Sequence, residues 1–544
     1  MADKSFDVVI VGGGNKSLVA AMYLTKFGKL SVGIFEERHE LGGGWCSEEC
    51  EPGFMSNVCS HAHYGFYHIP VEEDIPEWRT YGAKLRYCKV SGGVIFSEDD
   101  TCVALYSKNY DPTMEKTARE FAKFSQRDAD TWLWLWDKYK KYWEPAFHEW
   151  LWNPAVPLGE EDAMDRLIKN PDAGIDPMWL VYSPIRVLKD LFESLELRCA
   201  FERDLQSLGI QNDQDGMGWG ALIILFLVWT DSCHVVGGTH QLAHASQRVI
   251  YENGGRGFTK HPVEKVLIEN GKAIGIRLED GTEIEAKKAV LTSLDPEQTF
   301  FKMIGKEYLD RKLIRRIENL ERDWINITWY TWALRERPKY KAESFCPDIW
   351  TCEWLALGDK DIDTFRRESS ERKAHIWPTK TNLSVGYHYI DEDSMLCPEG
   401  YQLAHTEQYV LPAYALTDKE WKEREKYHAE DVIRTWQKYA PNMTWDNVIA
   451  YHPVTPYYTA NMQRNFAPAG NWCVVDATLS QLGKYRPTPE VAGHKLTGIK
   501  NFYCTGTAWH PFGCAQSAQG YNVYKVMAED LGLAKPWKDK GRPW

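Results

Sequence analysis

The sequence predicts an α/β fold in which a Rossmann-like domain is interleaved with an α+β domain. Three observations lead to this prediction. Residues 6–35 run strand, glycine turn, helix and strand, two dipeptides near residue 275 suit tight hairpins, and two stretches rich in tryptophan interrupt the pattern. A chain of 544 residues also exceeds what one hydrophobic core supports, so at least two domains are expected.

The N-terminal segment has the pattern of a βαβ unit. An apolar strand from Phe6 to Val11 leads into Gly12-Gly13-Gly14. A helix is expected from Ser17 to Phe27, and a second strand from Leu30 to Phe35. Such a unit begins a parallel sheet, because the helix returns the chain to the same edge.

The following segments are helical and aromatic. Tryptophan is frequent from Asn109 to Trp152, where the pattern is helical. The longest apolar run, Trp219 to Trp229, is about half of the ~20 residues that a membrane-spanning helix needs. We expect a buried helix there, with contact between this helix and a membrane surface at a pocket entrance as the alternative.

A three-stranded meander is predicted from Val263 onward. Asn270-Gly271 and Asp280-Gly281 suit two-residue hairpins, which need positive φ angles at their central positions. The meander ends in the apolar run Ala289 to Leu291, placed to return the chain to the main sheet.

The rest of the chain supplies a second aromatic region and a closing helix. Ile325 to Leu334 alternates like a sheet strand, and Thr417 with Glu420 forms a capping box for a helix toward Tyr439. After a glycine-rich stretch, a terminal helix is expected to end near Leu531.

Composition excludes several classes of protein. Hydrophobic residues make up 44% and charged residues 26%, as in packed globular domains. A net charge of -13 argues against nucleic acid as a partner. The 13 cysteines include no CxxC pair and no signal-peptide pattern precedes Asp7, so we expect reduced thiols in a cytoplasmic protein, with contact at the inner membrane face as the alternative.

The strongest motif is Gly12-x-Gly14-x-x-Ser17 directly after an apolar strand, with Glu36 at the end of the next strand. Gly12 allows a tight turn, Gly14 allows close approach of a pyrophosphate, and small Ser17 allows close packing of the helix. The helix N-terminus offers free N–H groups to phosphates, and Glu36 suits the ribose hydroxyls. The motif predicts a dinucleotide site but does not separate NAD from FAD.

Its continuation and the C-terminal segment resemble phytoene desaturase-like flavoproteins of the carotenoid desaturase and amine oxidase superfamily. The matching residues are Glu36-Glu37-Arg38, Leu41-Gly42-Gly43, Gly237-Gly238-Thr239, Arg486-Pro487, Asn501 to Thr507, His510-Pro511 and Gly520-Tyr521-Asn522. The resemblance covers about 100 N-terminal, 70 central and 90 C-terminal residues.

The resemblance implies an FAD-binding domain of the glutathione reductase type. Val263 would contact the adenine through its backbone, and a helix beginning near Cys514 would direct its positive end at the flavin's pyrimidine edge, where reduced flavin is negative. His510 would position the cofactor. The residues implied in FAD binding are Gly12, Gly14, Ser17, Glu36, Glu37, Arg38, Gly42, Gly43, Gly44, Trp45, Val263, Gly506, His510, Pro511, Cys514 and Ala515.

Two departures from the family pattern affect the site. Gly44 and Trp45 stand where relatives usually carry arginine, and Ser60 to Gly65 replaces a segment of small residues. By this alignment His61, His63 and Tyr64 lie near the isoalloxazine, where they either transfer a proton during hydride movement or pack beside the cofactor.

No metal is expected. His240 and His244 have a spacing that can ligate metal on a helix, but the sequence shows no third ligand beside them and the resemblance implies none.

These features predict an FAD-binding domain made of residues 1–100, 231–305 and 452–544, and a substrate domain made of residues 101–230 and 306–451. The leading hypothesis is oxidation of a hydrophobic isoprenoid or alicyclic substrate, by desaturation or allylic hydride abstraction. A tryptophan-rich pocket fits such a substrate.

Only one dinucleotide motif occurs, so electrons would leave to a quinone, an electron-transfer protein or dioxygen. Within the family, a limonene-type terpene dehydrogenase working with a related subunit is one concrete interpretation. A redox-neutral isomerase or hydratase, and an FAD-holding subunit of a homo- or hetero-oligomer, are the alternatives.

Overall fold

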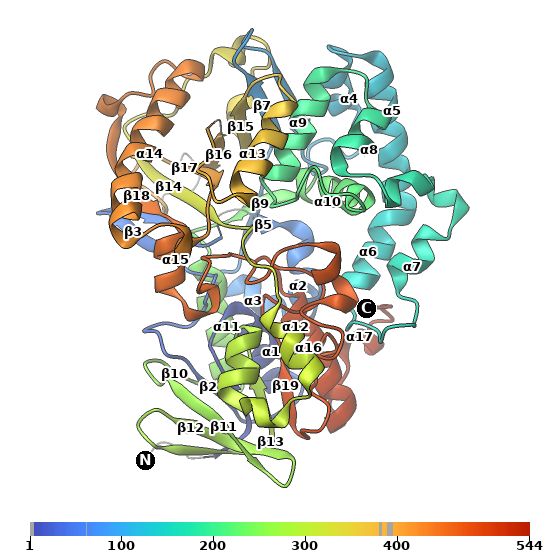
Figure 1. The fold of residues 1–544 in the computed structure, drawn as a ribbon, viewed down its shortest axis with the longest axis vertical. Coiled ribbons are helices and arrows are strands. Elements are labelled where there is room, and N and C mark those ends of the chain that lie inside the picture. Colours follow the sequence, from blue (N-terminus) through green and yellow to red (C-terminus); the bar gives the residue numbers. More distant parts are fainter. Residues whose placement is uncertain (1–4, 61–62, 380–382, 389–394) are drawn as a thin grey trace.

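Two seven-stranded sheets organise the molecule, one near each end of its long axis (Figure 1). The computed structural model describes residues 5–60, 63–379, 383–388 and 395–544. The lower sheet has the order β10-β2-β1-β13-β12-β11, and β19 also pairs with β13. Its strands are β1 (Ser5–Val11), β2 (Val32–Phe35), β10 (Arg256–Phe258), β11 (Val263–Glu269), β12 (Lys272–Leu278), β13 (Glu283–Thr292) and β19 (Phe502–Cys504).

The lower sheet joins the N-terminal, central and C-terminal parts of the chain. Strand β1 is parallel to β2 and β13, and β19 is parallel to the end of β13. Strands β11, β12 and β13 form the antiparallel meander that the two hairpin dipeptides predicted. The first part of β13 pairs with β12 and its apolar end enters the parallel sheet, so this one strand connects meander and sheet.

Three helices from distant parts of the sequence pack together beside this sheet: α1 (Asn15–Lys26) lies against α11 (His240–Glu252) and α16 (Ala518–Leu531). The terminal helix ends at Leu531, as predicted. It begins at Ala518 rather than near Cys514, because Cys514 has a φ of +88°, outside the right-handed helical region.

The upper sheet is mixed, with the order β18-β14-β17-β16-β15-β7-β8. Strands β7 and β15 are parallel and the other pairs are antiparallel. Its strands are β7 (Val90–Phe96), β8 (Cys102–Tyr106), β14 (Ile327–Leu334), β15 (Cys352–Gly358), β16 (Leu383–His388), β17 (Gln402–Tyr409) and β18 (Val448–Val454). The α/β class, with a Rossmann-like N-terminal part and a mixed-sheet second part, is therefore confirmed.

Smaller elements connect the two sheets. Strands β5 (His63–Tyr64), β9 (Ser232–Val235) and β6 (Leu85–Tyr87) form a short sheet, and β3 (Glu48–Glu51) pairs with β4 (Phe54–Ser56). The remaining helices are α2 (Ile69–Asp74), α3 (Pro76–Thr80), α4 (Glu115–Ala122), α5 (Gln126–Lys138), α6 (Glu144–Leu151), α7 (Ala163–Ile168), α8 (Pro184–Leu191), α9 (Leu195–Gln206), α10 (Gly218–Trp229), α12 (Arg311–Glu318), α13 (Asp363–Lys373), α14 (Asp418–Tyr439), α15 (Pro456–Met462) and α17 (Pro536–Asp539).

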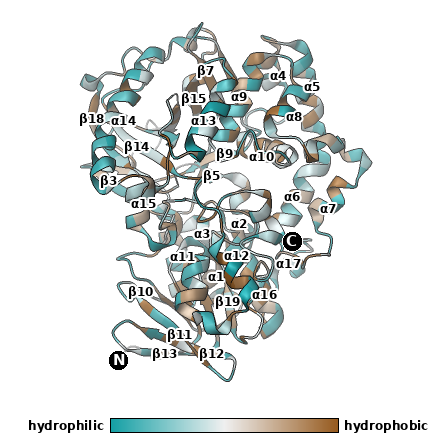
Figure 2. Ribbon diagram, viewed as in Figure 1, coloured by the Kyte–Doolittle hydropathy of each residue, from teal (hydrophilic) through white to brown (hydrophobic). Residues whose placement is uncertain are grey.

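Two local predictions about helices are confirmed. The apolar run becomes α10, whose side chains are buried except at Gly220 and Ile224. The capping box at the start of α14 is present, with Thr417 and Glu420 bonded reciprocally. In Figure 2, α12 and α13 are mainly hydrophilic in colour, in contrast to the core.

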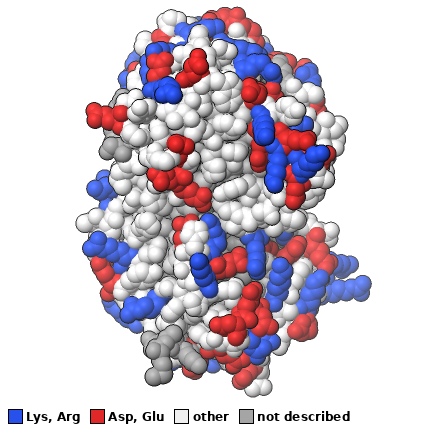
Figure 3. All heavy atoms as spheres, turned by 90° about the vertical axis from the view of Figure 1, so that its left-hand side faces the viewer, with Lys and Arg blue, Asp and Glu red and all other residues white. Residues whose placement is uncertain are grey.

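No helix in the described part of the chain has the length and apolar character needed to cross a membrane. On the face drawn in Figure 3, acidic and basic side chains intermingle without a field of one sign.

Candidate functional site

Two glycine turns meet at the N-terminus of α1. Gly12, with φ of +86°, makes the turn after β1, and Ser17 Oγ donates to its carbonyl oxygen at 2.6 Å. The second turn contains Gly43, where a Cβ atom would lie only 2.8 Å from the Gly14 Cα. Gly14 caps α1 without a side-chain hydrogen bond, so the first N–H groups of the helix have no side-chain partner at this cap.

An outer cleft opens beside these turns, with about 700 Å³ of empty space when its opening to solvent is included. Glu36, Arg38 and Val263 line it, so three of the residues predicted to bind the cofactor are brought together. Glu36 accepts hydrogen bonds from the backbone N–H groups of Gly13 at 2.6 Å and Arg38 at 2.9 Å. Glu37 also lines the cleft and pairs with Arg464 at 3.1 Å.

An inner cavity lies between the two sheets, with about 1510 Å³ of empty space when its opening to solvent is included. The outer cleft and the inner cavity share five lining residues, so they adjoin at the start of α1. The shared residues are Gly14, Gly43, Ser293, Gln463 and Asn465.

One side of the inner cavity comes from both ends of the chain. Lys16 Nζ donates to the carbonyl oxygens of Cys514 at 2.6 Å and Gln516 at 2.8 Å. Asn15 and Trp45 both donate to the carbonyl oxygen of Ala515, at 3.1 and 2.9 Å. These bonds hold the segment before α16 against the start of α1, so the two predicted cofactor motifs meet.

Lys16 and Cys514 are titratable groups on this side of the cavity. Burial lowers the pKa of Lys16 to about 7. The Cys514 side chain is exposed, yet it lines the inner cavity, so its exposure is to internal space. Hydrogen bonding from Cys473 lowers the pKa of the Cys514 thiol to about 7.

The opposite wall is aromatic and belongs to the upper sheet. Trp329 of β14 stacks on Trp472 with ring centroids 4.9 Å apart. Trp354 of β15 and Tyr409 of β17 also line the cavity. Such walls bind apolar ligands by burial and shape.

A carboxyl group belongs to this aromatic wall. Glu407 of β17 lies directly opposite Trp329 in the strand pairing and lines the cavity. The side chain is buried, its Oε1 has no hydrogen-bond partner, and burial raises its pKa to about 8. A carboxyl group in this state can accept or donate a proton near neutral pH.

The three residues predicted to be catalytic have different positions. His61 lies outside the described residues. Tyr64 lines the inner cavity, and burial raises its pKa well above the ordinary value. His63 is buried behind Ser60, a cavity residue, whose Oγ is 3.2 Å from His63 Nε2.

His63 belongs to a hydrogen-bonded row that leads away from the cavity. Its Nδ1 is 3.2 Å from His68 Nε2, and His68 Nδ1 is 2.7 Å from Ser517 Oγ, just before α16. Two residues that line the cavity therefore contact His63: Ser60, and Tyr67, whose ring centroid lies 5.9 Å from that of His63.

Several predicted cofactor residues lie behind the walls. His510 donates from Nε2 to the Trp150 carbonyl oxygen at 3.1 Å, and neither it nor Pro511 is among the residues lining the cleft or the cavity. Burial lowers the pKa of His510 to about 4. Gly506, with φ of +132°, precedes the lining residue Thr507. These residues are placed to shape the site from behind.

The glycines of the second turn differ in their surroundings. The backbone N–H of Gly42 donates a hydrogen bond to the carbonyl oxygen of Gly13 at 2.8 Å. Gly44 lines the inner cavity, and a Cβ there would meet nothing within 4 Å. The space that an arginine would enter is thus left open to the cavity.

His240 and His244 lie side by side on α11 with ring centroids 5.1 Å apart. Among the described residues, no third histidine, cysteine, aspartate or glutamate forms a possible metal site with them.

Sequence reasoning missed Lys16, Glu407, Gln463 and Asn465. Lys16 stands inside the glycine motif, so its position was a signal. Glu407 is a polar residue at an inward position of an alternating strand, which is informative only once the inward face is known.

The comparisons with known proteins agree with this geometry. A model of the NAD(P)-binding Rossmann-like domain matches residues 10–75. A solved structure of a putrescine oxidase variant aligns with a TM-score of 0.56 at 13% identity, over 97% of this chain and 98% of that chain. The zeta-carotene-forming phytoene desaturase of Myxococcus xanthus is 24% identical over 59% of this chain and 56% of that protein. The chain therefore has a Rossmann-like N-terminal domain, and its sequence is similar to those of oxidoreductases of the phytoene desaturase and amine oxidase superfamily.

Some relatives match over nearly their full length. A limonene dehydrogenase subunit of Castellaniella defragrans is 24% identical over 581 residues, which cover 98% of this chain and 97% of that protein. At this identity the match is that of a distant homologue.

Proposed function

We propose that the chain binds FAD and uses it to oxidise a hydrophobic isoprenoid or alicyclic substrate. The observation that carries this proposal is that the outer cleft and the inner cavity adjoin beside the N-terminus of α1, with five lining residues in common. A dinucleotide with a tricyclic ring fits such a space in length and in chemistry, with phosphates at the helix N-terminus.

The residues present fit FAD in the orientation known from glutathione reductase-type domains. Glu36 and Val263 would hold the adenosine, Gly14 and Gly43 would approach the pyrophosphate, and Lys16 would lie beside the ring system. The bound cofactor would supply hydride acceptance. Among the described residues the Lys16 ammonium group donates to carbonyl oxygens, and in its protonated form it would favour negative charge in the cavity.

The substrate is proposed to be apolar because the cavity wall is aromatic. Trp329, Trp354 and Tyr409 supply surface for burial. Full burial of such a molecule contributes about 25 cal/mol for each Å² of apolar surface removed from water.

Glu407 is the residue proposed to handle the proton. Oxidation of an allylic C–H bond removes a hydride, and either proton loss from a neighbouring carbon or addition of water then releases one proton. The Glu407 carboxylate can take that proton inside the cavity. Tyr64, which also lines the cavity, is proposed to contact the substrate.

The electrons are proposed to leave to a quinone or an electron-transfer protein. The relative from Castellaniella defragrans is named as a subunit, which supports a second candidate, in which this chain acts as the FAD-holding subunit of a heteromeric dehydrogenase. The interleaved division of the chain into an FAD-binding and a substrate domain is likewise a proposal.

The test is the visible spectrum of the purified protein under anaerobic conditions, before and after limonene, other small terpenes, alicyclic compounds and carotenoid precursors are added. Bleaching of the oxidised flavin band by one compound is expected. If a bound flavin is bleached by none of them while a compound is isomerised or hydrated, a redox-neutral reaction replaces the proposal. If bleaching needs a co-purifying related chain, the subunit candidate holds.

A further inference from the structure

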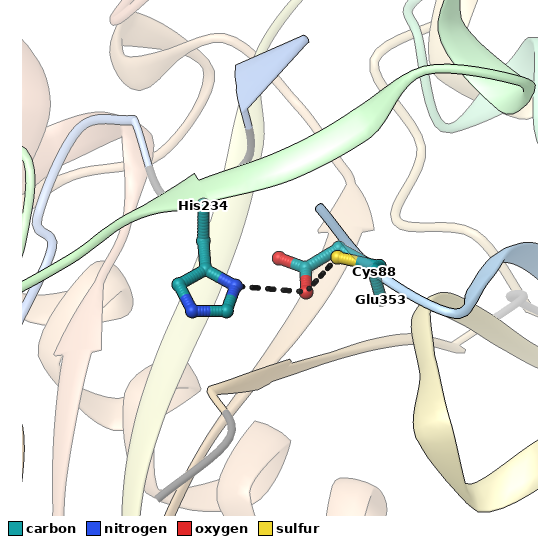
Figure 4. Close-up of side chains that lie close together, drawn as sticks. All are labelled: Cys88, His234 and Glu353. Carbon is teal, nitrogen blue, oxygen red and sulfur yellow. Dashed lines mark hydrogen bonds and ion pairs between the residues drawn. The ribbon is translucent and has the colours of Figure 1, made fainter. Parts of the chain in front are cut away.

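A thiol, an imidazole and a carboxylate converge at a buried point outside the cavity lining (Figure 4). Cys88 follows β6, His234 belongs to β9 and Glu353 to β15, so three elements far apart in the sequence each contribute one side chain. The three residues are 2%, 0% and 0% exposed.

The distances fit a small metal ion. The Cys88 thiol donates to Glu353 Oε2 at 3.2 Å, and His234 Nδ1 lies 3.8 Å from the same oxygen. All three ligand atoms lie within 4.8 Å of one another. Tetrahedral zinc, with bonds of ~2.0–2.3 Å, sets its ligand atoms roughly 3.3–3.6 Å apart, so small side-chain rotations would complete the site.

The charges also favour a divalent cation. In the described part of the chain Glu353 forms an ion pair only with His234, and no lysine or arginine reaches it. Glu353 Oε1 is buried without a hydrogen-bond partner. A thiolate, a carboxylate and a neutral imidazole together carry two negative charges, which an ion of charge +2 neutralises, and burial makes such neutralisation valuable.

The donor set selects the kind of metal. Thiolate sulfur is a poor ligand for magnesium and calcium, which take oxygen ligands. Sulfur, imidazole nitrogen and carboxylate oxygen are the three donor types that zinc uses. Two further buried thiols, Cys233 and Cys352, are the sequence neighbours of His234 and Glu353.

We infer that Cys88, His234 and Glu353 form a zinc-binding site, with water as the fourth ligand. On binding, the Cys88 thiol gives its proton to solvent or buffer and a sulfur–zinc bond forms, without any change of oxidation state. The ion would join β9, which pairs with the Tyr64 strand, to β15, which carries Trp354, and so brace the wall of the cavity.

The test uses the full-length protein as isolated, with its cofactor. After incubation with zinc sulfate and desalting, elemental analysis is expected to give about one zinc per chain. X-ray absorption at the zinc edge is expected to show one sulfur at ~2.3 Å and nitrogen or oxygen ligands at ~2.0 Å. Folded wild-type protein that retains no zinc, or zinc without a sulfur ligand, would overturn the inference.

Variants locate the metal. Cys88→Ser and Glu353→Gln are each expected to lower zinc affinity by about tenfold or more. Cys199→Ser, which removes a buried thiol of α9, is the matched control and should retain the zinc. Unchanged zinc binding in both site variants would contradict the assignment. If those variants do not fold, the sulfur ligand seen in wild-type protein decides the question.

Discussion

Glu407 is a carboxyl group buried in the aromatic wall of the inner cavity. Its carboxyl group is buried against Trp329 with a pKa of about 8, and no cation stands among the causes of that value. Glu407→Gln should therefore lower the rate of flavin reduction by roughly 10²–10⁴-fold, as loss of a general base does. In wild-type protein that rate should rise with pH through about 8; in the variant it should be flat.

The same pKa predicts a change in stability. Because the pKa of Glu407 is higher in the folded than in the unfolded protein, the folded state binds this proton more tightly. The stabilisation that results is fully present below the unfolded pKa of ~4.3 and decreases as pH rises toward about 8. In urea unfolding, the free energy of unfolding of Glu407→Gln should lack this decrease. That of Glu423→Gln, a change at an exposed position of α14, should keep it. Equal pH dependence in all three proteins would argue that Glu407 is ionised in the native state.

At the scale of elements, the two glycine turns test the proposed pyrophosphate site. Gly43→Ala should lower FAD affinity by about tenfold or more, because its Cβ would meet the Gly14 Cα at 2.8 Å and its φ is +57°. Gly44→Ala, with no atom within 4 Å, should bind FAD normally. Gly159→Ala has a φ of +95° and open space, so it controls for backbone strain alone. Equal affinities in Gly43→Ala and Gly159→Ala would remove the turn from the site.

The elements also show what the sequence could predict. The βαβ unit, the meander, α10 and the cap of α14 follow from local patterns of hydrophobicity and turn residues, and all are present. The predicted start of α16 was wrong. The left-handed conformation at Cys514 is held by a hydrogen bond from Lys16, about 500 residues away in the chain. The place of His510 behind the wall depends likewise on Trp150, a partner that no local pattern reveals.

At the scale of the whole molecule, the site exists only because distant segments meet. The cavity joins the start of α1, the segment before α16 and the strands β14 and β17. The predicted boundary at residue 100 falls between β7 and β8, which pair in the upper sheet, so we propose that the second domain begins before β7. Glycine motifs predicted one side of the cavity, whereas the opposite wall, with Glu407, required the sheet register.

The most direct test of the account is the cofactor content of the purified chain. Protein confirmed as folded by circular dichroism, incubated with FAD and desalted, is denatured and the released nucleotide is identified by chromatography and mass. We expect about one FAD per chain, since the sequence contains one dinucleotide-binding motif, Gly12-x-Gly14-x-x-Ser17. Folded protein that retains no FAD, or that binds NAD(P) in its place, would contradict the central claim.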